Sequence, residues 1–293
     1  MVDPRHLESA GNPIMCKEND SSLLRRAFSA LARVSKKDGA LVIVQLSHAG
    51  RQTPISVNDH PFSCSDVPLE SCMIKAGEPI PLGLDQIKAE VIDRFVYAAK
   101  MARDTGFDGA QIHAAHGYLL SQFLSLTTNK RTDEYGGSLE NRFRIIREIF
   151  EAIREEIPAK TGFVVGIKAN SVEFQKDGLS TEDAKEACAM MEECGFDFVE
   201  LSGGNLAKPA WCHERESSKK REAYFIELAE KMGQMSKRPL SELQSVCDDI
   251  ADLSNPEEVK NFLKFIAVIT REIEKMNSER KPVFGRISYS NLY

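Results

Sequence analysis

Long apolar runs are missing from this chain of 293 residues. The longest apolar stretch near the C-terminus, residues 262–269, is interrupted by Lys264 and is far shorter than the ~20 residues that span a bilayer. The N-terminus has no apolar segment of the kind found in secretory signals. We therefore expect a soluble, cytoplasmic protein without a membrane partner.

Paired cysteines and basic stripes are missing as well. The seven cysteines are scattered, and none forms a Cys-x-x-Cys pair of the kind that binds zinc or an iron–sulfur cluster. The net charge is −6, and no basic stripe is interleaved with aromatic residues. These absences argue against a metal site and a nucleic-acid partner, and they favour a small-molecule substrate.

What the chain does contain is an alternation of strand-like and helix-like segments. The run 41–46 is almost continuously apolar, as in a parallel strand buried on both faces. Asp20 and Ser180 stand where two helices are expected to begin, and the stretch 47–84 is typical of a loop with a small hairpin. Further strands are expected at 108–113, 163–169 and 196–201, and helices at 21–37, 85–104, 138–157, 181–194 and 219–235.

This alternation predicts an α/β protein with a parallel sheet, either open or closed into a barrel. Two helix-to-strand junctions have the same sequence, Gly106-Phe107-Asp108 and Gly195-Phe196-Asp197, with glycine placed to end the helix. No Gly-x-Gly-x-x-Gly follows a strand. The repeated junction therefore favours a repeated βα barrel over a dinucleotide-binding sheet.

Three ring-bearing polar side chains stand at the exit of the predicted strand 108–113, in the segment 113–118 (HAAHGY). Catalytic groups of α/β enzymes gather at such strand ends. From the sequence alone, His113 and His116 have two other interpretations: metal ligands, which would need a third ligand, or hydrogen-bonded structural groups. Tyr118 has the alternative of packing in the loop.

Three longer motifs resemble the old yellow enzyme family of FMN-dependent NAD(P)H oxidoreductases. They are residues 45–52 (QLSHAGRQ), 113–125 (HAAHGYLLSQFLS) and 130–142 (KRTDEYGGSLENR), and they stand in the same order as in the family. The likeness covers residues 1 to about 232. It implies a (β/α)8 TIM barrel that binds FMN and takes electrons from NADH or NADPH.

The resemblance also implies roles for five residues. His113 and His116 match the two donors that hold the carbonyl oxygen of an activated alkene, and Tyr118 matches the proton donor to its α-carbon. Gln45 matches the residue that pairs with the pyrimidine edge of the flavin, and Lys168 matches the cation beside the flavin N1–C2 carbonyl. The simpler interpretations are a strand-capping amide for Gln45 and a surface lysine for Lys168.

The chain departs from the family at both ends of the barrel. Residues 2–6 (VDPRH) resemble the segment after the second barrel strand, and the motifs of strands 7 and 8 are not found. We therefore expect an incomplete barrel over 1–235, with strands 1–2 and 7–8 largely missing, and a divergent segment over 236–293. An amphipathic helix over about 256–276 is expected there, suited to covering a barrel edge or to binding a protein partner or a second copy.

These observations lead to two functional hypotheses. The first is an FMN-dependent ene reductase that passes hydride to an activated alkene or enone, with Tyr118 as proton donor. The alternative is a catalytically silent truncated barrel, or an incomplete isoform without stable FMN binding, that binds a partner.

Overall fold

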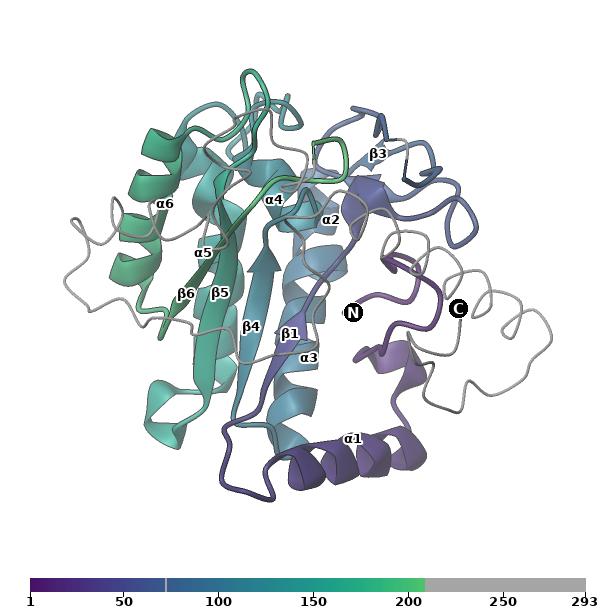
Figure 1. Cartoon of the computed structure of the whole chain (residues 1–293), viewed down its shortest axis with the longest axis vertical. Coiled ribbons are helices and arrows are strands. Elements are labelled where there is room, and N and C mark those ends of the chain that lie inside the picture. The colour runs from purple at the N-terminus through teal and green to yellow at the C-terminus, as the bar shows by residue number, and fades with distance from the viewer. Residues whose placement is uncertain (72, 209–293) are drawn as a thin grey trace, which may run out of the picture. The chain divides into compact units, whose positions relative to one another are not determined.

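The computed structural model describes residues 1–71 and 73–208, and all structural statements below concern these ranges. Residues 1–8 and 13–208 belong to one compact unit. Its centre is a four-stranded parallel sheet in the order β1-β4-β5-β6 (Figure 1). The strands are β1 (Ile43–Leu46), β4 (Gly109–Ala114), β5 (Val164–Val172) and β6 (Val199–Gly203). The parallel pairing is what the strand–helix alternation predicts.

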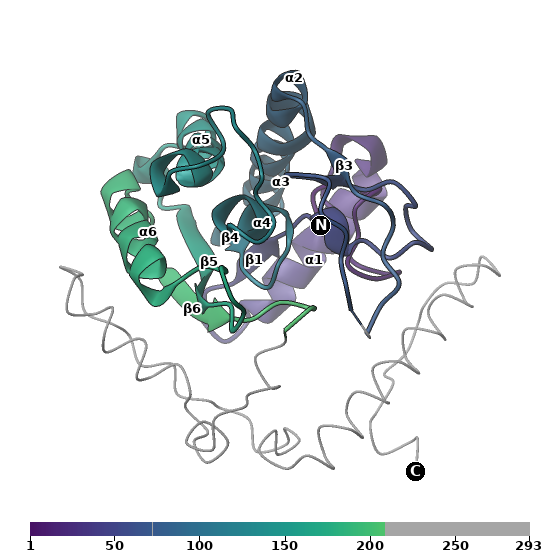
Figure 2. The same cartoon turned by 90° about the horizontal axis from the view of Figure 1, so that it is seen from above.

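One long helix joins each strand to the next. These helices are α3 (Asp93–Asp104), α5 (Leu139–Glu156) and α6 (Thr181–Cys194), and Figure 2 shows them along the outer face of the curved row of strands. The other described helices are α1 (Ser22–Ser35), α2 (Leu84–Ile87), η3 (Lys88–Ile92), α4 (Leu119–Leu124), η1 (Lys17–Asn19), η2 (Gly50–Gln52) and η4 (Ala159–Thr161). The fold is therefore three successive βαβ units, the arrangement of a TIM barrel.

Apolar side chains at helical spacing hold the helices against the sheet. On α5, Phe143, Ile146 and Ile153 are fully buried, and each contributes about 1.5–3 kcal/mol by leaving water. Strand β4 is buried along its whole length, with Ala110 and Ile112 fully inaccessible. Because alternate residues of a strand point to opposite faces, the polar side chains between them share the other face of the sheet.

The two Gly-Phe-Asp junctions have the same structure, as their sequence predicts. Gly106 and Gly195 both adopt a left-handed φ, of 92° and 96°, at the end of a helix. The Asp108 carboxylate then accepts a hydrogen bond from Val42 N at 2.9 Å, and the Asp197 carboxylate accepts one from Val165 N at 2.7 Å. Each junction thus ties the new strand to the start of its neighbour.

Several sequence expectations need correction. Ser21, not Asp20, caps α1, because its hydroxyl accepts from Leu24 N; the Asp20 carboxylate instead pairs with Arg25. In the loop 47–84, β2 (Phe62–Ser63) and β3 (Ile80–Pro81) pair in parallel and not as a hairpin, and the antiparallel pairing among the described residues is an isolated bridge between Pro54 and Ala76. Strand β1 is not buried on both faces, since it lies at an edge of the described sheet and Gln45 is exposed.

The helical segments also differ in detail. The expected helix 85–104 contains a π-helical stretch, η3, between α2 and α3. Helix α1 buries Phe28 and Ala32 but leaves Leu23, Leu31 and Val34 more than half exposed. None of the described helices has the length and apolar character needed to cross a membrane. The expected helices 219–235 and 256–276, the domain boundary at 235 and the expected loss of barrel strands 7–8 all concern residues outside the described ranges.

Candidate active site

Polar side chains converge where β4, β5 and β6 end. The strand register pairs His113 with Lys168, Lys168 with Glu200, and Asn170 with Ser202. Gln111 lies two residues before His113 and therefore shares its face of β4. The sheet thus presents a row of hydrogen-bonding groups at its carboxyl edge, where parallel α/β proteins bind their ligands.

The three rings of segment 113–118 contact one another edge to face. The ring centroid of His113 lies 5.0 Å from that of His116 and 4.9 Å from that of Tyr118, and the His116–Tyr118 distance is 6.4 Å. The structure therefore brings together the three residues that the sequence singles out. Their chemical roles stay predictions.

His113 is held with its proton on Nε2. The backbone N–H of Ala115 can only donate, and it donates to His113 Nδ1 at 3.2 Å, so the ring hydrogen must sit on the other nitrogen. Burial, with smaller contributions from His116 and Lys168, lowers the pKa of His113 to about 3. At neutral pH this side chain is an uncharged hydrogen-bond donor.

His116 sits in a strained turn. Its φ is 61°, a left-handed value that costs a residue with a Cβ about 1–3 kcal/mol. The turn is held because His116 N donates to Asn170 Oδ1 at 3.1 Å, and because Gly117 follows with a φ of 78° where a Cβ would collide with Gln52 and Asn205. Burial, followed by the charge of Lys168, lowers the pKa of His116 to about 4.

Tyr118 occupies the N-cap position of α4 without a side-chain capping hydrogen bond, and its phenol stays protonated. Burial, together with the nearby Glu8 carboxylate, raises the pKa of Tyr118 far above its usual range. The next residue is fixed from outside the helix, since Leu119 N donates to His48 O at 3.0 Å. The phenol is thus a neutral acid beside two neutral imidazoles.

The two predicted flavin contacts belong to one chain of hydrogen bonds across all four strands. Gln45 Nε2 donates to Gln111 Oε1 at 2.6 Å, and Gln111 Nε2 donates to Glu200 Oε2 at 2.7 Å. Lys168 Nζ lies 2.9 Å from Glu200 Oε1. Burial alone would raise the pKa of Glu200, but the bonds from Lys168 and Gln111 outweigh it and lower that pKa.

Sequence reasoning missed Gln111, Glu200, Asn170 and Ser202. The sequence pattern could have indicated these residues. Polar residues at every second position of an otherwise apolar strand mark a face that is not packed against helices. Their mutual contacts depend on register between strands that lie up to about ninety residues apart, and no local pattern gives that register.

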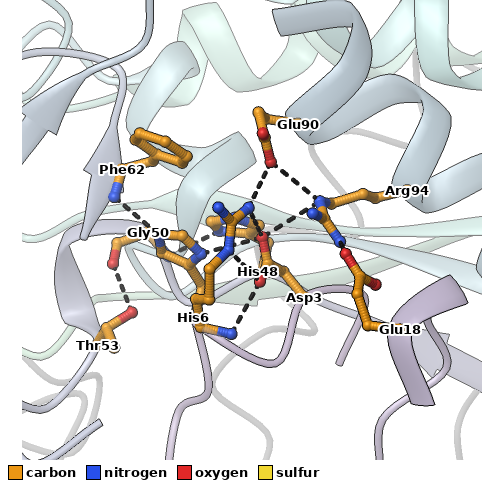
Figure 3. A network of polar contacts seen from close by, with 10 residues as sticks. Asp3, His6, Glu18, His48, Gly50, Thr53, Phe62, Glu90 and Arg94 are labelled. Carbon is orange, nitrogen blue, oxygen red and sulfur yellow. Dashed lines mark hydrogen bonds and ion pairs between the residues drawn. The ribbon is translucent and has the colours of Figure 1, made fainter. Parts of the chain in front are cut away.

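A second polar cluster joins the N-terminal segment to the loop after β1 (Figure 3). It contains Asp3, His6 and His48, which are all buried and whose metal-ligating atoms lie within 4.8 Å of one another. His6 Nε2 accepts from Phe62 N at 2.8 Å, and His48 Nδ1 accepts from Gly50 N at 3.1 Å. Each ring therefore carries its proton on the nitrogen that remains.

This donor set does not suit a metal ion. A ligating imidazole must offer a lone pair, and the lone pairs of both rings are already used by backbone N–H groups. The Asp3 carboxylate also accepts from Arg5 at 2.7 Å and pairs with Arg94 at 3.2 Å. The cluster is better described as a buried clamp that fixes the backbone of His48, and through its carbonyl the start of α4.

The buried neutral histidines predict an acid-sensitive fold. The unfolded chain takes up a proton at each histidine below pH 6.5, whereas the folded chain resists protonation of His113 until about pH 3 and of His116 until about pH 4. The free energy of unfolding should therefore fall as the pH drops from 6.5 to 4, by ~1.4 kcal/mol per pH unit for each of these two histidines.

Urea unfolding between pH 7 and pH 4 measures this slope. His113→Gln should lower the slope of the unfolding free energy against pH by the contribution of one histidine. The exposed His60→Gln is the matched control. Equal slopes in the wild type and His113→Gln would contradict the assignment of a neutral, buried His113.

The residues present fit the ring end of a flavin mononucleotide. Gln45 offers both an amide donor and an amide acceptor from an exposed position, and Lys168 offers a cation whose side chain is 19% exposed. The adjacent histidines and Tyr118 supply neutral donors on the same edge of the sheet. The expected loss of barrel strands 7 and 8 concerns residues outside the described ranges.

Comparison with known proteins gives a family match over most of the chain. Residues 10–290 match the model of the NADH:flavin oxidoreductase / NADH oxidase family. The matched range includes residues 236–290 of the C-terminal segment, whose divergence stays a prediction.

Two curated relatives carry names of the same kind. The chain is 43% identical over 236 residues to "NADH-dependent flavin oxidoreductase nadA" of Aspergillus parasiticus, an alignment that covers 79% of this chain and 53% of the relative. It is 36% identical over 201 residues to "NADH oxidase" of Thermoanaerobacter brockii, with coverages of 66% and 29%. The chain thus spans about half or less of the length of these two relatives.

Solved structures share the fold. A complex of 2-naphthoyl-CoA reductase with 2-naphthoyl-CoA superposes with a TM-score of 0.67 at 26% identity, covering 78% of this chain and 36% of that one. TcOYE with pHBA superposes with a TM-score of 0.62 at 22% identity, covering 71% and 62%. The described sheet and helices therefore have the arrangement found in TIM-barrel proteins related to old yellow enzyme.

Proposed function

Because this chain belongs to the NADH:flavin oxidoreductase / NADH oxidase family, we propose that it is an FMN-dependent oxidoreductase that reduces the C=C bond of an activated alkene or enone. Relatives named NADH-dependent flavin oxidoreductase support the redox class. The choice of alkene as substrate rests on the resemblance of segment 113–118 to the family's motif, and the arrangement of these residues supports it.

One observation carries the proposal: two neutral histidines and one protonated tyrosine lie in mutual contact at the carboxyl edge of the sheet. Neutral donors suit an oxygen that is uncharged in the substrate and becomes anionic during reaction. Their N–H groups stabilise the developing charge without having to be desolvated during the step. Reduction of a conjugated carbonyl compound needs donors for its oxygen and an acid for its α-carbon, and the two imidazoles and the phenol can supply them.

The reaction balances with these groups. The hydride comes from NADH or NADPH by way of FMN when that cofactor is bound, and Gln45 and Lys168 are the residues that would hold the ring edge. Hydride addition at the β-carbon moves the π electrons onto the carbonyl oxygen, where His113 and His116 stabilise the enolate. The enolate then takes the phenolic proton of Tyr118 at its α-carbon, and water returns a proton to the tyrosinate.

The raised pKa of Tyr118 is compatible with this role. An enolate carbon that forms a C–H bond is a strong base, so the phenol need not be acidic at rest. The tyrosinate left behind is destabilised by burial and by Glu8, and it is therefore reprotonated readily. The same environment keeps the proton in place until the substrate has received hydride.

The test is to titrate the flavin-free chain with FMN and then to add NADH in the absence of oxygen. We expect saturable binding, a yellow complex, bleaching by NADH, and recovery of the colour when 2-cyclohexenone is added. Lys168→Gln should weaken FMN binding about tenfold, since it removes a charge worth ~1.4 kcal/mol in a partly buried site. The exposed Lys160→Gln is the control.

A chain that binds no FMN at saturating concentration would refute the enzyme proposal. That result would leave the alternative of a silent barrel that binds a partner. A yellow chain that NADH reduces but enones do not reoxidise would refute the alkene substrate alone.

A further inference from the structure

Ser202 contacts the proposed active site without being part of any motif assigned above. It lies on β6, where the register pairs it with Asn170 of β5, and its hydroxyl oxygen is 2.6 Å from His116 Nε2. Ser171, on the neighbouring strand, donates to the Ser202 carbonyl at 2.8 Å and so fixes its backbone. The hydroxyl therefore faces the imidazole from a rigid strand.

The proton on His116 decides what this side chain can do. Nε2 is occupied by Ser202, so Nδ1 is the ring nitrogen left for a ligand. If Ser202 accepts from Nε2–H, Nδ1 presents a lone pair and repels an anionic oxygen. If Ser202 donates to Nε2, Nδ1 carries the hydrogen and attracts that oxygen.

The surroundings favour donation by Ser202. Among the contacts between described residues, the hydroxyl has His116 Nε2 as its hydrogen-bond partner, so donation there uses its only hydrogen. Acceptance would leave that hydrogen without an acceptor among the described residues, at a half-buried site. His113, the other member of the pair, is already fixed by Ala115 N with its open nitrogen protonated.

We propose that Ser202 is a positioning residue that donates to His116 Nε2, places the ring proton on Nδ1, and so completes a pair of N–H donors for an enolate or phenolate oxygen. This inference deepens the proposed function and rests on it for the identity of the oxygen. The tautomer itself is a property of the chain that can be measured without flavin or turnover.

The experiment is long-range ¹H–¹⁵N correlation NMR on the full chain labelled with ¹⁵N-histidine, free of flavin at pH 7. Loss of one signal in His116→Gln assigns the residue. We expect the wild type to show a protonated Nδ1 and an unprotonated Nε2 at His116. Ser202→Ala should move the proton to Nε2 in a large fraction of molecules, and Ser202→Thr should keep the wild-type tautomer.

A second readout is the affinity for a para-substituted phenol, whose phenolate oxygen resembles the enolate. Ser202→Ala should weaken phenol binding by 10- to 100-fold, and Ser202→Thr should restore it. Ser35→Ala is the matched control, because it removes an exposed hydroxyl at the end of α1, outside the site. A merely structural role of Ser202 would not change the tautomer in a variant that remains folded.

A wild-type His116 protonated at Nε2 would overturn the inference, as would an unchanged tautomer in Ser202→Ala. If Ser202→Ala does not fold, the wild-type spectrum still decides the direction of the bond. Failure of the proposed function would look different: the tautomers would be as expected, but the chain would bind neither FMN nor the phenol.

Discussion

Tyr118→Phe is expected to slow alkene reduction by about 10²- to 10⁴-fold while leaving flavin reduction by NADH nearly unchanged. The substitution removes the proton that the α-carbon receives but keeps the ring that packs edge to face against His113 at 4.9 Å. Hydride transfer from NADH does not use that proton. The two half-reactions therefore separate the role of the phenol from the integrity of the site.

Stopped-flow spectroscopy measures both half-reactions on the FMN-loaded chain. Tyr135→Phe is the matched control, since it removes a buried phenol whose hydroxyl donates to Glu148 at 2.8 Å, a contact made outside the site. Equal losses in both half-reactions of Tyr118→Phe would show that the phenol is structural. Unchanged alkene reduction would show that water, or another acid, protonates the α-carbon.

The second large effect is expected for His113→Leu, with alkene reduction slowed by about 10²- to 10³-fold. Leucine fills much of the space of this buried side chain, which is 4% exposed, but it offers no N–H to the developing oxyanion. It also removes the acceptor of Ala115 N, which costs about 1–3 kcal/mol of stability. The kinetic loss must therefore be separated from a folding loss.

His113→Asn separates them, because its amide can accept from a backbone N–H and also donate to an oxygen. We expect His113→Asn to retain most of the activity and of the phenol affinity that His113→Leu loses. Unfolding in urea reports the stability of each variant. If His113→Leu and His113→Asn lose alkene reduction equally while both remain folded, the oxyanion role of His113 is wrong.

Contacts from the buried clamp at Asp3 and from β5 hold the backbone of the site in place. Tyr118 directly precedes α4, His48 O accepts from Leu119 N, and the His48 ring accepts from Gly50 N in the buried clamp. Asn170 holds the strained backbone of His116 from β5. The backbone at His116 and after Tyr118 is thus held from two other segments, which suits the proposed stabilisation of a short-lived charge.

Much of the fold could be predicted from the sequence. Strand and helix positions follow from apolar periodicity, Ser180 caps α6 by accepting from Asp183 N at 3.0 Å, and the repeated Gly-Phe-Asp junctions indicate repeated βα units. These features are local, since each depends on residues within one turn or one strand. The local sequence does not distinguish Asp20 from Ser21 as the cap of α1. In the structure Asp20 forms an ion pair with Arg25, and Ser21 is the residue that caps the helix.

The sequence by itself determined that the chain is an α/β protein of this flavin oxidoreductase family, and it singled out Gln45, His113, His116, Tyr118 and Lys168 as candidate site residues. Only the tertiary structure decided which partners they have. Glu200 beside Lys168, Gln111 beside Gln45 and Ser202 beside His116 come from other strands, and strand register is set by packing of the whole sheet. The proton position on His113 follows from the local contact with Ala115 N, whereas that on His116 depends on Ser202 of another strand, a contact that no single stretch of sequence contains.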